Sequence, residues 1–80
     1  MAIVVAAKNG PKTWGYARIN NKFVSFWGSN GGLGGTDEKT SEAYFTTLWK
    51  QKRTNSGGFK EIDEAELRQR MPTLPEEFFA

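Results

Sequence analysis

The segment of residues 13–28 constrains the fold more than any other part of the sequence. Two runs rich in β-branched and aromatic side chains, 12–19 and 22–27, lie on either side of Asn20-Asn21. Asparagine accepts a positive φ more readily than most residues, so two consecutive asparagines favour a two-residue type I′ turn. The pattern therefore predicts a β-hairpin in which the second run folds back on the first.

The predicted hairpin has two faces of different chemistry, because side chains alternate across a strand. The turn sets a register in which Ile19 lies opposite Lys22 and Trp14 lies opposite Trp27. One face carries small and aliphatic residues, with a lysine at its end and one phenylalanine: Gly15, Ala17, Ile19, Lys22, Val24 and Phe26. The other face is aromatic with an embedded arginine: Trp14, Tyr16, Arg18, Phe23, Ser25 and Trp27. Because small residues leave room for a helix, we expect the main helix on the first face and a ligand surface on the second.

The segments that flank the hairpin differ in composition. Residues 3–8 are mostly β-branched and small apolar residues, which predicts a strand, and Asn9-Gly10-Pro11 is a turn signal. Residues 29–38 contain four glycines in five positions and are predicted to form a loop, in which the glycines indicate either flexibility or a close approach of the backbone to another group. This loop lacks the lysine and hydroxyl residue of a Walker A loop and the context of a dinucleotide fingerprint.

The C-terminal half predicts two helices. Thr40 or Ser41 can cap the first helix, whose apolar stripe is Tyr44, Phe45, Leu48 and Trp49. The sequence Asn55-Ser56-Gly57-Gly58 is expected to end it. A short strand over 59–62 and a second helix over 63–70, capped by Asp63, follow. After Pro72 and Pro75, Phe78-Phe79 either docks on the body or is exposed as an anchor for a partner.

This order of elements predicts an α+β fold, in which a small antiparallel sheet of about four strands packs against one main helix. A short helix or tail completes the chain. Residues 1–62 are expected to form the α+β domain and residues 63–80 an acidic helix and tail.

Composition excludes several classes of chemistry. The chain has no cysteine and no histidine, which rules out disulfides, thiol catalysis, a Ser-His-Asp triad and metal sites built on those residues. We therefore expect no enzymatic activity, no metal and no cofactor. The apolar run before Lys8 is too short for a signal peptide or a membrane span, so we expect a cytoplasmic protein that does not contact membranes.

The small net charge of +2 hides an asymmetry along the chain. Residues 1–60 hold nine basic and three acidic residues, a balance of +6. Residues 61–80 hold two basic and six acidic residues, a balance of −4. A basic body favours polyanionic partners, and an acidic tail can fold over the same surface or repel those partners.

Over about residues 12–62 the chain resembles the WGR domain, a Trp-Gly-Arg module found in DNA-dependent poly(ADP-ribose) polymerases and in standalone bacterial proteins. The residues that carry this resemblance are Phe26-Trp27-Gly28, Gly31, Gly32, Glu42-Ala43-Tyr44-Phe45, Leu48, Lys52 and Gly58-Phe59. The resemblance implies a hairpin followed by a helix, and contact of the motif's tryptophan with the end of broken DNA. Only the tryptophan carries over, to Trp27, because Ser29 stands where the family has arginine.

Two functions follow from these patterns. The first is nucleic-acid binding, to single-stranded or end-containing DNA, by aromatic and basic residues that stack bases and approach phosphates. The candidate residues are Lys12, Trp14, Tyr16, Arg18, Lys22, Phe23, Trp27 and Lys60. The same aromatic side chains would instead be core residues if another segment covers them.

The second function is protein binding, for example as a phage accessory protein or an inhibitor of a host enzyme or defence complex. Exposed tryptophan, tyrosine and arginine are frequent interface anchors, and the acidic tail could supply the contact. Long edge strands also make a homodimer an open alternative.

Overall fold

A five-stranded antiparallel sheet forms the centre of the molecule. The structure is a computed structural model and describes residues 2–54 and 57–80. The strands are β1 (Ile3–Asn9), β2 (Lys12–Ile19), β3 (Lys22–Ser29), β4 (Gly32–Lys39) and β5 (Lys60–Glu61). They lie in the order β4-β3-β2-β1-β5. The predicted α+β class is confirmed, with one strand more than expected.

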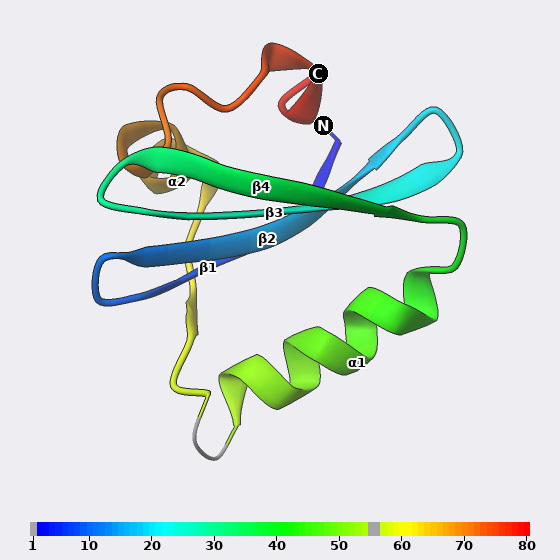
Figure 1. Ribbon diagram of the computed structural model, residues 1–80, viewed down its shortest axis with the longest axis horizontal. Coiled ribbons are helices and arrows are strands. Elements are labelled where there is room, and N and C mark those ends of the chain that lie inside the picture. Colours follow the sequence, from blue (N-terminus) through cyan, green and yellow to red (C-terminus); the bar gives the residue numbers. More distant parts are fainter. Residues whose placement is uncertain (1, 55–56) are drawn as a thin grey trace.

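The helical segments lie on both sides of this sheet. Helix α1 (Glu42–Arg53) follows β4, and helix α2 (Glu64–Arg70) and the 3-10 helix η1 (Glu76–Phe78) follow β5. Figure 1 shows α1 on one side of the sheet and α2 with the C-terminal segment on the other. The sheet is therefore the middle layer of three.

The central hairpin has the predicted register. Asn20 and Asn21 have φ values of 52° and 64°, as a type I′ turn requires. The turn places Ile19 opposite Lys22 and, further along the ladder, Trp14 opposite Trp27. The side chains therefore divide between the two faces as the sequence predicts.

The prediction of a loop over residues 29–38 is wrong. Asn30 and Gly31, with φ values of 55° and 85°, form a second tight turn, and Gly32–Lys39 pairs with β3 as β4. Glycine is a poor strand former because it loses much backbone entropy. Pairing with β3 along the whole segment overrides that preference, and the indole of Trp27 lies against its partner Gly35.

The expected position of the main helix is also wrong, because α1 covers the aromatic face of the hairpin. Phe45 of α1 is fully buried and stacks on Tyr16 with ring centroids 5.4 Å apart. Trp49 stacks on Trp14 at 6.2 Å. These rings of α1 and the sheet thus interlock, and their burial outweighs the room that the small-residue face offers.

The small-residue face is covered by the C-terminal segment. Its core consists of Ala6, Ala17, Phe26, Ile62, Leu67, Met71, Leu74, Phe78 and Phe79. Phe78 meets Phe26 edge to face, with centroids 5.5 Å apart and an interplanar angle of 81°. Residues 63–80 therefore dock on the body. Of the two alternatives for Phe78-Phe79, docking is the one observed, and the pair is not an exposed anchor.

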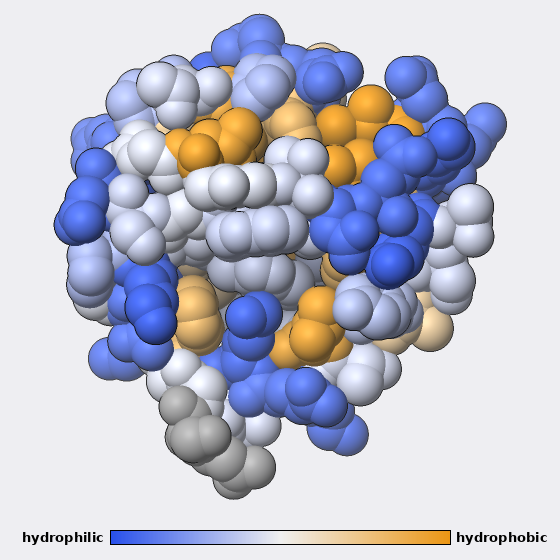
Figure 2. All heavy atoms as spheres, viewed as in Figure 1, coloured by the Kyte–Doolittle hydropathy of each residue, from blue (hydrophilic) through white to orange (hydrophobic). Residues whose placement is uncertain are grey.

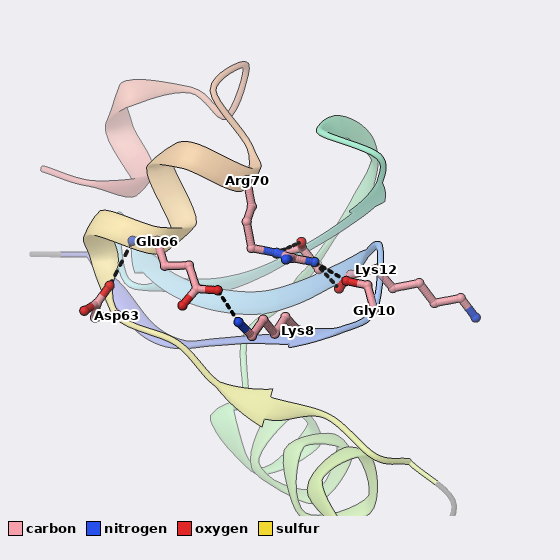
Figure 3. Close-up of polar contacts among 7 residues, drawn as sticks. Lys8, Gly10, Lys12, Asp63, Glu66 and Arg70 are labelled. Carbon is pink, nitrogen blue, oxygen red and sulfur yellow. Dashed lines mark hydrogen bonds and ion pairs between the residues drawn. The ribbon is translucent and has the colours of Figure 1, made fainter.

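Polar contacts fasten α2 to the hairpin formed by β1 and β2 (Figure 3). The guanidinium of Arg70 donates to Thr13 Oγ1 at 3.0 Å and to the carbonyls of Gly10 and Lys12 at 2.5 and 3.2 Å. Lys8 pairs with Glu66 at 2.5 Å. These contacts join residues that are far apart in the sequence and hold the C-terminal segment against the sheet.

The helix ends agree partly with the sequence patterns. Asp63 caps α2 as predicted, since its carboxylate accepts a hydrogen bond from the Glu66 amide at 2.8 Å. Ser41 occupies the N-cap position of α1 but its side chain makes no capping hydrogen bond. Helix α1 ends at Arg53, and Asn55 and Ser56 of the predicted stop signal lie outside the described residues.

Candidate ligand groove

An open groove of about 770 Å³ separates part of α1 from the strands β3 and β4. It is lined by Lys12, Thr13, Trp14, Ser25, Trp27, Gly28, Ser29, Gly32, Leu33, Gly34, Asp37, Tyr44, Leu48, Lys52 and Phe59. The glycines of β4 carry no side chain that could fill the space between this strand and the helix. The rings of α1 pack on Trp14 and Tyr16 of β2, and the groove lies beside them, toward Trp27 of β3 and the glycines of β4.

Trp27 is the main apolar surface of the groove. Its side chain is 41% exposed, whereas Trp14, directly opposite on β2, is only 4% exposed. A Cβ atom added to Gly35 would lie 2.7 Å from the Trp27 ring, so the indole rests on the bare backbone of β4. The exposed part of the ring lines the groove.

Two lysines lie at one end of the groove. Lys52 on α1 places its Nζ 5.3 Å from the ring centroid of Trp14 and 5.1 Å from that of Phe59. Burial lowers the pKa of Lys52 below its usual value, and the nearby charge of Lys12 lowers this pKa further. Within residues 2–54 and 57–80, neither lysine forms an ion pair with a carboxylate. This end of the groove therefore attracts anions.

At the other end of the groove, positive and negative charges nearly cancel. Asp37 lines the groove, and its carboxylate lies 3.7 Å from the ammonium of Lys39. Lys39 in turn lies over the ring of Tyr44, which is 50% exposed. The groove thus offers two exposed rings along its length and positive charge at one end.

Tyr16 and Phe23, two of the predicted site residues, do not line the groove. Tyr16 is buried under α1, and its hydroxyl donates to Glu42 Oε2 at 3.0 Å. Burial, followed by the hydrogen bond to Glu42, raises the pKa of Tyr16 to about 12. Phe23 is half-buried in the same cluster. Both side chains hold α1 on the sheet.

Three predicted basic residues lie elsewhere on the surface. Arg18 is exposed and lines a separate hollow with Ala2 and Glu77. Lys22 pairs with Glu38 at 3.0 Å, and Lys60 is exposed on β5. The structure therefore brings together Lys12, Trp14 and Trp27 from the predicted set, with Trp14 almost fully buried at the floor.

Sequence reasoning missed Leu33, Tyr44, Lys52 and Phe59 as lining residues. The spacing of Leu48 and Lys52, four residues apart, places both on one side of a helix and offered a signal. Leu33 carried none, because its position depends on β4 being a strand. The missed residues come from different elements and meet only in the folded chain.

The fold and the groove define a small α+β domain with one closed and one partly open sheet face. Comparison of the chain with known protein families, characterised proteins and solved structures gives no match. Among the described residues, no group of acidic side chains is arranged to hold a metal ion. None of the helices in this part of the chain has the length and apolar character needed to cross a membrane.

Proposed function

We propose that this domain is a non-enzymatic module that binds single-stranded nucleic acid in the groove between α1 and β3–β4. One observation carries the proposal: the same groove is lined by an exposed indole and by two lysines that pair with no carboxylate within the described residues. Single strands need both features, because their unstacked bases present ring faces and their phosphates present charge.

The arrangement of these groups supports a defined orientation of the strand. A base stacks on the open face of Trp27, whose other face is supported by Gly35. Tyr44, across the groove on α1, offers a second exposed ring. The phosphates of neighbouring nucleotides lie toward Lys12 and Lys52. The strand therefore runs along the groove with its backbone near the lysines.

The register of the sheet bears on the resemblance to the WGR domain. Ser29 occupies the position of the missing arginine, and Lys12 lies directly opposite it on β2. A cation is thus present on the neighbouring strand, although it cannot form the bidentate phosphate contact of an arginine. This placement supports nucleic-acid binding without the arginine and favours single strands over a specific DNA end.

The test is a titration of a fluorescent 12-nucleotide oligothymidine, and of a nicked duplex, at two salt concentrations. Lys12→Ala and Lys52→Met each remove one proposed phosphate contact, and the methionine leaves an uncharged side chain of similar length beside the rings of Trp14 and Phe59. The slope of log K against log salt should fall by about 0.7 for each lysine that is replaced. Lys60→Ala, which removes an exposed lysine outside the groove, is the matched control and should leave the slope unchanged.

The tryptophan gives a second and independent measurement. Trp27→Ala should weaken oligothymidine binding by about 5- to 150-fold, the range that follows from about 1–3 kcal/mol of stacking per base. Because the ring is only 41% exposed and covers Gly35, circular dichroism of the variant should first show that it keeps the fold. The proposal fails if neither nucleic acid binds at low salt, or if Trp27→Ala binds as the unchanged protein does.

A further inference from the structure

Strand β4 is an edge strand over its whole length, and one row of its backbone groups has no partner among the described strands. The hairpin register identifies that row. A two-residue turn makes Ile19 and Lys22 a hydrogen-bonded pair, and bonded and non-bonded pairs alternate along an antiparallel ladder. The Arg18 amide donates to the Ala2 carbonyl on the β1 side, in agreement with this alternation.

The alternation continues into β4. The backbone N–H and C=O of Phe26 form hydrogen bonds with β2. Its partner on β4, Thr36, therefore turns its own N–H and C=O away from β3. Glu38, two residues further along, does the same. These groups face outward and are available to another extended chain.

The edge is flanked by a hollow on each face of the sheet. On the α1 side lies the groove with Trp27 and Tyr44. On the opposite side, a second hollow of about 530 Å³ is lined by Val24, Leu33, Thr36 and Phe78, among others. Figure 2 shows a pale band across the middle of the molecule, at the position of β4 in Figure 1, with hydrophobic surface above and below it.

We propose that β4 receives an extended peptide segment of a partner protein as a sixth strand. Backbone hydrogen bonds to Thr36 and Glu38 would hold the segment, and its side chains would enter the two hollows alternately. This is the usual mode of strand addition, in which backbone bonds give affinity and alternate pockets give specificity. The segment is expected to have several consecutive apolar or aromatic residues, because neighbouring side chains enter opposite hollows.

A second copy of this chain is a poorer occupant of the edge. Antiparallel pairing of two β4 strands about Thr36 places Gly34 opposite Glu38 and Gly35 opposite Asp37. Glycine has no side chain to enter a hollow, and carboxylate side chains do not suit apolar hollows. The chemistry of the hollows therefore favours a foreign apolar segment over self-association.

Charge sets the expected polarity of the segment. An antiparallel partner of β4 runs from Lys39 toward Gly32, so its C-terminal part lies at the end of the groove that holds Lys12 and Lys52. An acidic residue after the apolar run would neutralise these two lysines. The preferred ligand is thus an apolar stretch followed by aspartate or glutamate.

The experiment is selection from a phage-displayed library of random octapeptides on the full chain, followed by fluorescence anisotropy of the enriched peptides. We expect an apolar run followed by an acidic residue. Thr36→Pro removes an outward N–H that lies outside the ladder with β3, and proline is tolerated at such an edge position. It should weaken binding at least 10-fold, whereas the isosteric Thr36→Val, which keeps the N–H, should change binding less than 3-fold.

A second measurement uses the unchanged protein, so that a folding defect in Thr36→Pro cannot decide the result. The enriched peptide is N-methylated in two phases, one at its odd-numbered residues and the other at its even-numbered residues. One phase should abolish binding, and the other should leave it intact. The proposal is overturned if no peptide is enriched, if both phases bind equally, or if the free protein is a dimer that Thr36→Pro dissociates. Because the Thr36 backbone lies outside the nucleic-acid contacts, Thr36→Pro should keep its oligothymidine affinity, which separates this test from that of the proposed function.

Discussion

The two faces of the sheet differ in how completely they are covered. On one face, α2 and the segment to Phe79 bury a continuous apolar cluster around Phe26. On the other, a single helix buries Trp14 and Tyr16 but leaves Trp27 beside an open groove. The closed face buries the larger apolar cluster, and the partly open face carries the groove in which we propose that a ligand binds.

The pair formed by Trp14 and Trp27 shows this difference most directly. The two residues are opposite each other in adjacent strands and project from the same face. Trp49 of α1 stacks on Trp14 and the ammonium of Lys52 lies over its ring, whereas the neighbour of Trp27 on β4 is a glycine. Neighbouring elements, and not the residue type, therefore decide which tryptophan belongs to the core.

Deletion of residues 71–80 should lower the free energy of unfolding more than any of the substitutions below, because it uncovers one face of the sheet. It removes Met71, Leu74, Phe78 and Phe79, each buried, and exposes Phe26. Each buried apolar side chain of this size contributes about 2–5 kcal/mol, so the combined loss is at least as large as the total stability expected of a domain this small, within a typical range of about 5–15 kcal/mol. Circular dichroism should show no cooperative unfolding. A truncated chain that still unfolds cooperatively would mean that the closed face is not the stabilising one.

Trp14→Ala and Trp27→Ala form a matched pair for urea unfolding. Removal of the buried ring of Trp14 should cost about 3–5 kcal/mol. Removal of the partly exposed ring of Trp27, which covers Gly35, should cost clearly less than removal of the Trp14 ring, because it buries less apolar surface. Equal losses in the two variants would contradict the assignment of one ring to the core and the other to a binding surface.

High pH should weaken the contact of α1 with the sheet through Tyr16. The pKa of its phenol is 10.0 in the unfolded chain and about 12 in the folded protein. Stability from this group is complete below pH 10 and is lost as the pH rises through 12, by about 2–3 kcal/mol at about 1.4 kcal/mol per pKa unit. The free energy of unfolding should be measured from pH 9 to 12.

Tyr16→Phe is the control for that titration, because lysines also lose their charge in the same pH range. The variant lacks the hydrogen bond to Glu42 and starts from a lower stability. It should show a smaller decline above pH 10 than the unchanged protein. An identical decline in both proteins would assign the effect to other groups.

Arg70→Ala should have a smaller effect than Trp14→Ala or the ionisation of Tyr16, and it tests the attachment of the closed face. It removes three hydrogen bonds from the guanidinium to the β1–β2 hairpin. A hydrogen bond of a charged group contributes about 1.5–3 kcal/mol, and solvent at this half-exposed site should hold the whole loss near the lower value. Lys22→Ala, which breaks an exposed ion pair with Glu38, should cost less than about 1 kcal/mol in the same unfolding measurement.

The sequence predicts local structure better than the packing of distant elements. The Asn20-Asn21 turn and the Asp63 cap were predictable because each depends on a residue's own backbone preference or on neighbours a few positions away. The register followed from the turn alone. These features required no knowledge of the rest of the chain.

Features that depend on distant partners were not predictable from local patterns. Residues 32–35 form a strand only because β3 is beside them and the Trp27 ring covers Gly35. The face covered by α1 was mispredicted because the C-terminal segment, which the sequence left unplaced, occupies the small-residue face. The groove follows from both of these outcomes, so only Lys12, Trp14 and Trp27 of its lining were anticipated.

The contact between Phe26 and Phe78 has a consequence for the synthesis of this protein. The ribosome makes Phe26 and the rest of the hairpin long before it makes the residues that cover them. During this interval the nascent chain has an apolar sheet face open to chaperones and to other nascent chains. Messages that end before residue 71 would leave that face permanently uncovered, and their products should be removed by proteolysis.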